Sequence, residues 1–301
     1  CISQVLGFSL QDADDVRRIV GKKMVEKMQP WKEKIYNAAQ EKGMEERVAD
    51  FFWSALEAAA HYSFNKSHSF AYATLAAKTV YLKFNHPKEF FLSVLESAEF
   101  EPDPLQTISS VNQELPDFGI KLLPPDLFKS GLNFQIEGDD IRYGLNSIKG
   151  ISLRSLRSLV SFRGNSFDNK YHAFVAAKEC GINISVLAAL IQAGTMDSNT
   201  DNRIRLVLEA QSFNLLTDRE KRNLDKLGDK YNFDVLDSIA DIVDKQTLGD
   251  DNRPIMKPSR FETFKKKFDN YRSIYNENKK HHKFTYWWYE NSLLGYSYSF
   301  G

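Results

Sequence analysis

The chain has 301 residues, of which 42% are hydrophobic and 27% charged, and its formal net charge at pH 7 is zero. This composition excludes a disordered chain, and the length favours two domains, or one domain with an extension. A free-standing nucleic-acid-binding protein usually carries a clear basic excess, so any DNA contact must come from local patches or be shared with other parts.

Cysteine content and hydropathy both indicate a protein of the cytosol. Cys1 and Cys180 are too few for a disulfide framework or a zinc site, which fits a reducing cytosol. No apolar run approaches the length of a membrane span, and the first residues do not form a signal peptide. We therefore expect a cytoplasmic protein without membrane contact.

The first third of the chain has a helical pattern. Predicted helices cover Ser9 to Val20, Val25 to Glu41, Glu45 to His61, residues 88–98 and residues 105–116. An apolar run from Ile120 to Leu123 follows and stops at two prolines. This part of the chain is therefore expected to be almost wholly helical.

A cluster of four cations lies at the end of the first predicted helix. The cluster consists of Arg17, Arg18, Lys22 and Lys23, within seven residues and beside Gly21. Arginine presents a planar fork that suits phosphate oxygens, and lysine a mobile point charge, so a nucleoside triphosphate is a natural partner. The alternative is a solvated basic helix end, which the C-terminal helix dipole favours by itself.

Another helix is predicted to open near residue 65. Asn65, Ser67 and Ser69 are N-cap residue types, and Lys66 and His68 stand at the mouth of the helix. The first turn of a helix has unpaired N–H groups and partial positive charge, so a cationic mouth suits a phosphate. An ordinary capped helix with a solvated lysine and histidine is the alternative.

The middle of the chain combines a small hairpin with further helices. Asn133–Glu137 and Asp140–Gly144 read as two strands joined by a Gly-Asp turn. Helices punctuated by glycines follow to about residue 212, and one more is predicted over Phe261–Asn278. Residues 213–258 are charged and lack a firm periodicity, so the sequence assigns them no role.

A tight turn around Gly150 precedes a predicted helix over Leu153–Phe162. In a helix-hairpin-helix element, such a turn points backbone N–H groups at a DNA phosphate, which positions the duplex without reading its sequence. The DNA-binding candidates are Lys149, Gly150, Ile151, Ser152 and Arg154, with a possible second copy of the turn at Gly194 and Thr195. Each turn, taken alone, is also compatible with a plain helix–helix connection.

Three polar groupings are set aside as catalytic or metal sites. Asp12, Asp14 and Asp15 stand at a helix start, where acidic residues are stabilising anyway. Residues 116–119 lack the further aspartates of a two-metal site. The adjacent His281 and His282 do not share the i, i+4 helix face of many histidine-pair sites.

The C-terminal region is both basic and aromatic. Lys279–Lys283 is followed directly by a run of aromatic residues that ends at Tyr289. This stretch suits the stacking of bases or the binding of a partner. A helix that docks its aromatic side chains into the core is the alternative, and the sequence leaves both open.

The stretch from Phe64 to Leu82 reads FNKSHSFAYATLAAKTVYL, and it closely resembles the fingers signature of C-family replicative DNA polymerases, the bacterial DNA polymerase III alpha subunits. Lys83, Pro87, Glu89 and Phe90 continue the match. Ala13-Asp14 with the basic run Arg17 to Lys23, and Arg142–Leu145 followed by Ile148–Gly150, resemble further segments of the same family in the same order. The resemblance covers residues 1–212, is faint at 290–299 and is absent from 213–289.

The sequence departs from the family pattern at His61, Ser63 and Phe70, where the family has two glycines and a small residue. Loss of two glycines restricts the backbone, so phosphate contacts through this loop are less secure than those through side chains.

The resemblance implies a mainly α fold with three regions. These are a helical fingers region at 1–130, a β-hairpin with tandem helix-hairpin-helix elements at 131–212, and a divergent charged and aromatic extension at 213–301 that leads towards a further domain. The residues implied to surround the triphosphate of an incoming nucleotide are Arg17, Arg18, Lys22, Lys23, Asn65, Lys66, Ser67 and His68.

The implied activity is template-directed nucleotidyl transfer in DNA replication by a DNA-directed DNA polymerase. Mg²⁺ would be held by a palm domain outside this chain, so the chain is not expected to be active alone. The implied partners are primer-template DNA, deoxynucleoside triphosphates, the remaining polymerase domains and a sliding clamp.

Two alternatives remain open. One is a non-catalytic DNA-binding accessory protein derived from the polymerase. The other is the C-terminal piece of a split or intein-interrupted polymerase, because the chain starts in a helical pattern at Cys1, a nucleophile of the kind that follows an intein. An arbitrary chain boundary explains Cys1 without splicing.

Overall fold

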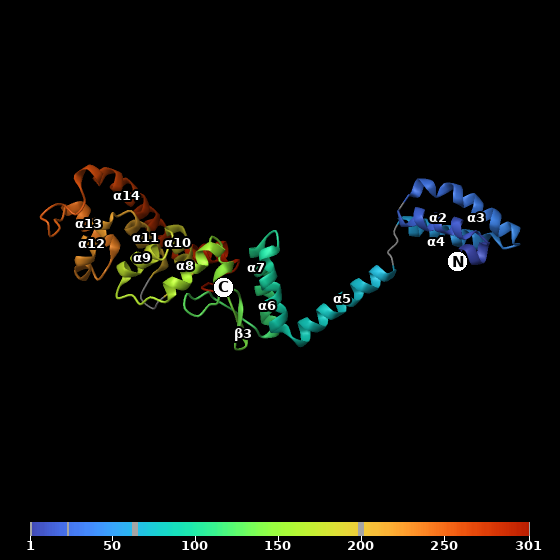
Figure 1. Cartoon of the computed structure of the whole chain (residues 1–301), viewed down its shortest axis with the longest axis horizontal. Helices are drawn as coiled ribbons and strands as arrows, with labels where there is room; N and C mark the ends of the chain where they lie inside the picture. The colour runs from blue at the N-terminus through green and yellow to red at the C-terminus, as the bar shows by residue number, and fades with distance from the viewer. Residues whose placement is uncertain (1, 23, 62–65, 198–201, 301) are drawn as a thin grey trace. The chain divides into compact units, whose positions relative to one another are not determined.

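The structure is a computed structural model that describes residues 2–22, 24–61, 66–197 and 202–300. The chain divides into two compact units, residues 1–81 and 82–301, and Figure 1 labels many of their helices. Each unit has its own buried apolar cluster, and each is described by itself.

The first unit is helical. It contains α1 (Ile2–Leu6), α2 (Leu10–Gly21), the 3-10 turn η1 (Val25–Lys27), α3 (Gln29–Glu41), α4 (Glu46–His61) and most of α5 (Lys66–Asn85). The single helix predicted from Val25 is wrong: it is divided into η1 and α3, because Pro30 lacks an N–H donor and stands in the first turn of α3. Ser9 caps α2, as its residue type predicts, by accepting a hydrogen bond from the Asp12 N–H.

Helical spacing builds the core of this unit. Ile35 and Ala39 of α3 and Ala49 and Trp53 of α4 are buried, and each pair is separated by four residues. The apolar side chains of α5, among them Phe70, are largely exposed and surround the helix without forming one face.

The second unit begins in the last turn of α5 and leads through helices to a small sheet. Its first elements are α6 (Pro87–Ser97), η2 (Ala98–Phe100), α7 (Pro104–Glu114), η3 (Leu115–Phe118), β1 (Leu122–Leu123), β2 (Gln135–Glu137) and β3 (Asp140–Arg142). The predicted hairpin is confirmed, with Ile136 of β2 opposite Ile141 of β3 in antiparallel register. β1 pairs in parallel with the other edge of β3, which the short apolar run could not predict.

The remainder of the second unit is helical. It contains η4 (Leu145–Ser147), α8 (Leu153–Arg163), α9 (Lys170–Glu179), α10 (Ile184–Gln192), α11 (Arg203–Asn214), α12 (Asp218–Lys226), η5 (Gly228–Tyr231), α13 (Val235–Lys245), α14 (Pro258–Lys280) and α15 (His282–Leu294). The segment 213–258, to which the sequence assigned no role, therefore has ordered helices, and α13 buries Val235, Ile239 and Ile242 at helical spacing.

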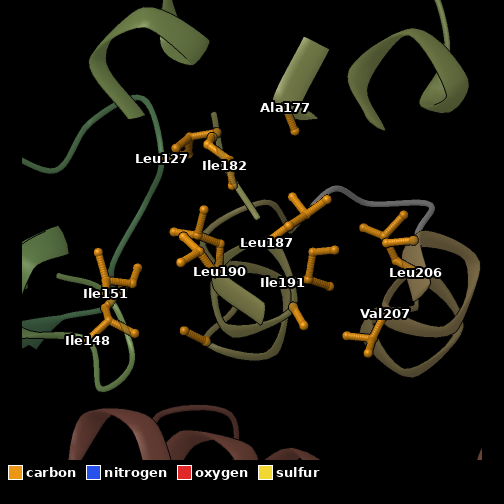
Figure 2. Packing of buried hydrophobic residues seen from close by; sticks show 14 of the residues in the cluster. Leu127, Ile148, Ile151, Ala177, Ile182, Leu187, Leu190, Ile191, Leu206 and Val207 are labelled. Carbon is orange, nitrogen blue, oxygen red and sulfur yellow. The ribbon is translucent and has the colours of Figure 1, made fainter. Parts of the chain in front are cut away.

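The core of the second unit is centred on α10, whose residues from Val186 to Ile191 are all buried. Figure 2 shows Leu187, Leu190 and Ile191 of this helix among side chains from several other segments. Ile148 and Ile151 lie on one side of α10, and Leu206 of α11 lies on the other. The turn around Gly150 is therefore attached to the centre of the unit.

The architecture is mainly α with one small sheet, as predicted. Within the described ranges, no helix combines the length and the apolar character needed to cross a bilayer.

Glu209 joins three helices of the second unit. Its buried carboxylate accepts hydrogen bonds from Lys170 Nζ of α9, at 3.0 and 3.1 Å, and from the Val235 N–H of α13, at 3.1 Å. Burial raises the pKa of Glu209 to about 7, although Lys170 acts to lower it. The carboxyl therefore binds a proton more tightly in the folded protein than in the unfolded chain.

This pKa difference predicts a specific pH dependence of stability. Between about pH 4.5 and 7 the folded state holds more protons at Glu209 than the unfolded state, so stability falls as the pH rises. At 1.36 kcal/mol per pKa unit, the loss is roughly 2–4 kcal/mol. In denaturant unfolding at pH 5 and pH 8, Glu209→Gln should remove most of this decrease. The exposed control Glu262→Gln should retain it, and an equal pH dependence in both variants would contradict the prediction.

Candidate nucleic-acid interface

The turn before α8, residues 148–151, has exposed polar atoms between two buried apolar side chains. Ile148 and Ile151 are buried, whereas Lys149 and Gly150 between them are exposed. Gly150 has φ of +93°, a left-handed conformation that favours glycine. The turn closes with a hydrogen bond from the Ile151 N–H to the Ile148 carbonyl at 3.1 Å.

The start of α8 is open to an anion. Ser152 occupies the N-cap position, but its hydroxyl lies 3.1 Å from Ser155 Oγ and caps no backbone N–H. In the part of the chain that the structure describes, no protein acceptor is found for the N–H groups of Gly150 and Ser152. Arg154 and Arg157 are exposed on the helix that follows. Unpaired N–H groups and exposed cations together form a surface suited to a phosphate.

Helix α15 supports this turn from the other end of the sequence. The Lys149 N–H donates to the Leu293 carbonyl at 3.0 Å, and the buried Tyr143 hydroxyl donates to the Leu294 carbonyl at 3.1 Å. The Lys149 N–H therefore already has an acceptor within the protein, and only the side chain of this residue remains available to a ligand. Arg163, further along α8, donates to the carbonyls of Leu127 and Ser130, so its charge is also used internally.

The second predicted turn has a structural role. The Gly194 N–H donates to the Ile191 carbonyl and the Thr195 N–H to the Leu190 carbonyl, which ends α10. Thr195 is buried, and its hydroxyl also donates to Leu190. A Cβ on Gly194 would lie 2.7 Å from the Arg203 guanidinium. The expected DNA contact of Gly194 and Thr195 stays a prediction, and both N–H groups have partners within the protein.

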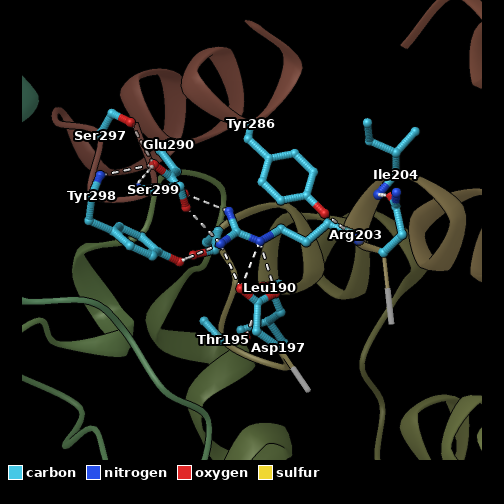
Figure 3. Close-up of polar contacts among 12 residues, drawn as sticks. Leu190, Thr195, Asp197, Arg203, Ile204, Tyr286, Glu290, Ser297, Tyr298 and Ser299 are labelled. Atoms are coloured by element: carbon cyan, nitrogen blue, oxygen red, sulfur yellow. Dashed lines mark hydrogen bonds and ion pairs between the residues drawn. The ribbon is translucent and has the colours of Figure 1, made fainter. Parts of the chain in front are cut away.

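Arg203 and Glu290 form a buried ion pair beside this second turn. Arg203 Nη1 lies 2.7 Å from Glu290 Oε1, with side chains 3% and 0% exposed. Arg203 Nε also donates to Asp197, and its guanidinium lies 4.5 Å from the centre of the Tyr286 ring. Figure 3 shows that these groups come from α11, α15 and the loop after α10.

The C-terminal segment completes the network around Glu290. Glu290 Oε2 accepts hydrogen bonds from the Ser297 hydroxyl at 2.7 Å, the Tyr298 N–H at 2.9 Å and the Ser299 N–H at 3.1 Å. Burial by itself would raise the pKa of Glu290, but hydrogen bonds from Ser299 and Arg203 outweigh it and lower the pKa. Burial likewise opposes the charge of Arg203, but Asp197 and Glu290 raise its pKa.

The cations predicted to bind a nucleotide lie on α2. Arg17 Nε and Arg18 Nη2 donate to the two carboxylate oxygens of Asp14, each at 2.9 Å, so the structure brings these three residues together. Hydrogen bonds from the two arginines lower the pKa of Asp14. The Arg17 and Arg18 side chains are 74% and 57% exposed, which leaves them accessible to a ligand.

The other nucleotide-site candidates are described in part. Lys22 is exposed at the C-terminal cap of α2, and Ser67 and His68 lie in the first turn of α5, with the His68 ring 4.4 Å from that of Tyr72. Lys66 begins α5, and its side chain is not described. Two further candidates, Lys23 and Asn65, lie outside the described residues, as does Cys1, which was considered for the intein alternative. The grouping of the α2 cations with the start of α5 stays a prediction.

Comparison with known proteins agrees with the expected family. A family model described as a helix-hairpin-helix motif matches residues 119–206. The DNA polymerase III alpha subunits of Thermus aquaticus and Aquifex aeolicus are each 35% identical to the chain over 68% of its length, which is 17% and 18% of theirs. The chain is homologous to a segment of the DNA polymerase III alpha subunits.

The chain spans about a fifth or less of the length of these relatives. The alpha subunit of Borreliella burgdorferi is 31% identical over 86% of this chain and 21% of its own length. An alignment that long extends into the segment 213–289. The expectation that the resemblance is absent from that whole segment is therefore wrong.

Sequence reasoning missed the pair Arg203–Glu290. One signal was available, since Glu290 is the single acidic residue between 278 and 301, among many aromatic ones. A lone carboxylate in an aromatic helix must face solvent or a buried cation. The sequence does not identify that cation, because Arg203 lies 87 residues away.

Loss of Arg203 should strongly destabilise the second unit. Arg203→Ala leaves the Glu290 carboxylate buried without its cation, which costs about 3–5 kcal/mol. Urea unfolding should detect this loss. The exposed pair Arg272–Asp269, at 3.9 Å, provides the matched control, and Arg272→Ala should cost about 0–1 kcal/mol. A cost below about 1 kcal/mol for Arg203→Ala would show that the buried pair does not hold the helices together.

Proposed function

We propose that this chain supplies the duplex-facing and nucleotide-facing helices of a DNA-directed DNA polymerase that acts in replication. The observation that carries this proposal is the exposed turn at Lys149–Gly150, which lies between the buried Ile148 and Ile151 and within the segment that matches the helix-hairpin-helix model. The homology to polymerase III alpha subunits supports the same role.

At the duplex, this turn would bind one backbone phosphate. The N–H groups of Gly150 and Ser152 donate to phosphate oxygens, and the side chains of Lys149 and Arg154 neutralise the charge. Contacts of this kind position DNA without reading its sequence, which a polymerase that copies any template requires. Primer-template DNA is therefore the proposed ligand of this surface.

In the proposed nucleotide site, α2 and the start of α5 would bind the triphosphate. Arg17 and Arg18 would exchange their hydrogen bonds to Asp14 for bonds to phosphate oxygens, assisted by residues at the start of α5 such as His68. Cations fixed beside the triphosphate stabilise the negative charge that develops during phosphoryl transfer. These residues would position and stabilise the substrate, and they form no bond to it.

The described residues do not fit a catalytic metal site, since they contain no group of three or more histidine, cysteine or acidic side chains that could hold an ion. No step of the proposed mechanism therefore passes through a metal bound to this chain. Mg²⁺, the other polymerase domains and a sliding clamp belong to the proposal through the homology alone.

The ion pairs that Asp14 forms with Arg17 and Arg18 favour a second candidate function. If Arg17 and Arg18 keep their bonds to Asp14 in the assembled protein, these donors are not used on a triphosphate and the chain acts as a DNA-binding accessory protein. Duplex binding is common to both candidates, whereas nucleotide binding separates them.

Binding to duplex DNA should depend on Lys149. Lys149→Ala should weaken the binding of every sequence tested to the same extent, and should reduce the slope of log affinity against log salt by about 1, because one phosphate contact is lost. Fluorescence anisotropy with two unrelated duplexes at several salt concentrations measures both effects.

The control for this experiment is Lys226→Ala, which removes another exposed lysine, on α12. It should leave affinity and salt slope close to those of the parent. A change for only one of the two duplexes would argue for sequence reading and against a phosphate-binding turn.

Nucleotide use should depend on Arg17, Arg18 and Lys66. In an assembly that contains the remaining polymerase domains, each alanine variant should lose about ten- to a hundredfold in kcat/KM for nucleotides, since a charge-assisted hydrogen bond is worth about 1.5–3 kcal/mol. Primer-template affinity should be nearly unchanged. Steady-state primer extension at varied nucleotide concentration measures the effect.

Arg47→Ala is the matched control, because Arg47 is also an exposed arginine paired with a carboxylate in the first unit. It should lose almost nothing. Efficiencies within about twofold of the parent for all three test variants would show that these residues are solvated cations and do not bind the triphosphate.

A further inference from the structure

Helix α15 carries a group of exposed aromatic side chains in addition to the buried Glu290. Phe284, Trp287 and Trp288 are 61%, 42% and 57% exposed. The Phe284 and Trp287 rings are stacked, with centroids 5.7 Å apart and planes at 24°, and the Trp288 ring lies 6.3 Å from that of Phe284. We call these three residues the aromatic platform.

The orientation of α15 leaves the aromatic platform in solvent. Thr285, Glu290 and Leu294 are buried, and the bond between Glu290 and Arg203 fixes which side of the helix faces the core. Phe284, Trp287 and Trp288 stand at i, i+3 and i+4, so they share one side of the helix, and their exposed fractions show that this side faces solvent. A single exposed aromatic residue is ordinary, but three of them, with Phe284 in ring contact with both tryptophans, form a patch that suits a ligand.

The charge around the aromatic platform favours a polyanion. Residues 279–289 contain three lysines and two histidines and no acidic residue, although the whole chain is neutral. Lys279, Lys280 and Lys283 are all exposed. An aromatic surface flanked by cations matches a ligand that has both flat bases and phosphates. An apolar protein partner would not require the lysines.

We propose that the aromatic platform binds single-stranded DNA, with bases stacked on Phe284, Trp287 and Trp288 and phosphates next to the flanking lysines. Stacking on aromatic rings tolerates any base, because every base has a flat face. Binding should therefore be independent of sequence and sensitive to salt.

The position of the aromatic platform connects it to the turn at Lys149. Leu293, five residues after Trp288 on the same helix, accepts the hydrogen bond from the Lys149 N–H. Five residues of α-helix span about 7.5 Å, or roughly two nucleotide steps of one strand. The platform would thus receive the unpaired strand where it leaves the duplex. This link to the duplex rests on the proposed function, whereas single-strand binding does not.

The test uses the full chain and a fluorescein-labelled oligonucleotide of about 12 thymidines. Trp288→Ala should weaken its binding about tenfold, because one base–aromatic stack contributes a factor of about five to a hundred. The control Phe100→Ala removes a phenylalanine that is 82% exposed elsewhere in the second unit, and binding should be unchanged. Trp31 and Trp53 are buried, so quenching of tryptophan emission by the unlabelled oligonucleotide reports on the platform.

An abasic oligonucleotide of equal length separates stacking from charge. The parent should bind it at least tenfold more weakly than the thymidine oligonucleotide, because every stack is lost, and Trp288→Ala should not weaken it further. Thymidine binding by Trp288→Ala within about twofold of the parent would overturn the proposal and leave the platform as a protein-docking surface. Unfolding curves of the variant exclude a folding defect. Lys149→Ala should retain the difference in affinity between the thymidine and abasic oligonucleotides, because that difference reports stacking alone, so the two proposals fail separately.

Discussion

The buried ion pair between Arg203 and Glu290 is the constraint on which the arrangement of the second unit depends. It joins the first residue of α11 to the middle of α15, and it also holds the chain at 297–299. The carbonyl of Leu293, one turn further along α15, supports the Lys149 N–H. A rotation of α15 would therefore disturb the turn that we propose to bind duplex DNA, together with the exposed aromatic platform.

An ion pair defines this geometry in a way that apolar packing does not. Replacing a buried pair with well-packed apolar side chains is often neutral or stabilising, so stability does not explain its presence. The guanidinium of Arg203 directs separate N–H groups at Asp197, Glu290 and Tyr298, and each bond has a required direction. Apolar side chains tolerate small rotations of a helix, whereas this network favours one orientation. We regard this specificity as its physical role.

The cationic side chains of the protein fall into two groups: those that bind acceptors inside it, and those that are exposed to solvent. Arg163 and Arg203 bind acceptors inside the second unit, whereas Lys149, Arg154 and the lysines beside the aromatic platform face solvent. Arg17 and Arg18 are intermediate, since they are exposed but bound to Asp14. A chain with no net charge can therefore still present local cationic surfaces, because its carboxylates neutralise cations selectively. Composition could not reveal this distribution.

The sequence by itself determined the local features of this protein. Helices with clear periodicity and caps, the turn at Gly138-Asp139 and the resemblance of residues 64–82 to a polymerase segment all depend on neighbouring residues. The tertiary structure decided which polar groups remain available to a ligand. The turn at Gly150 is exposed, while the turn at Gly194, also a glycine with positive φ that was predicted to contact DNA, is covered by Arg203 and Tyr298. Local sequence could not distinguish these two turns, because the residues that cover the second come from α11 and from the end of the chain.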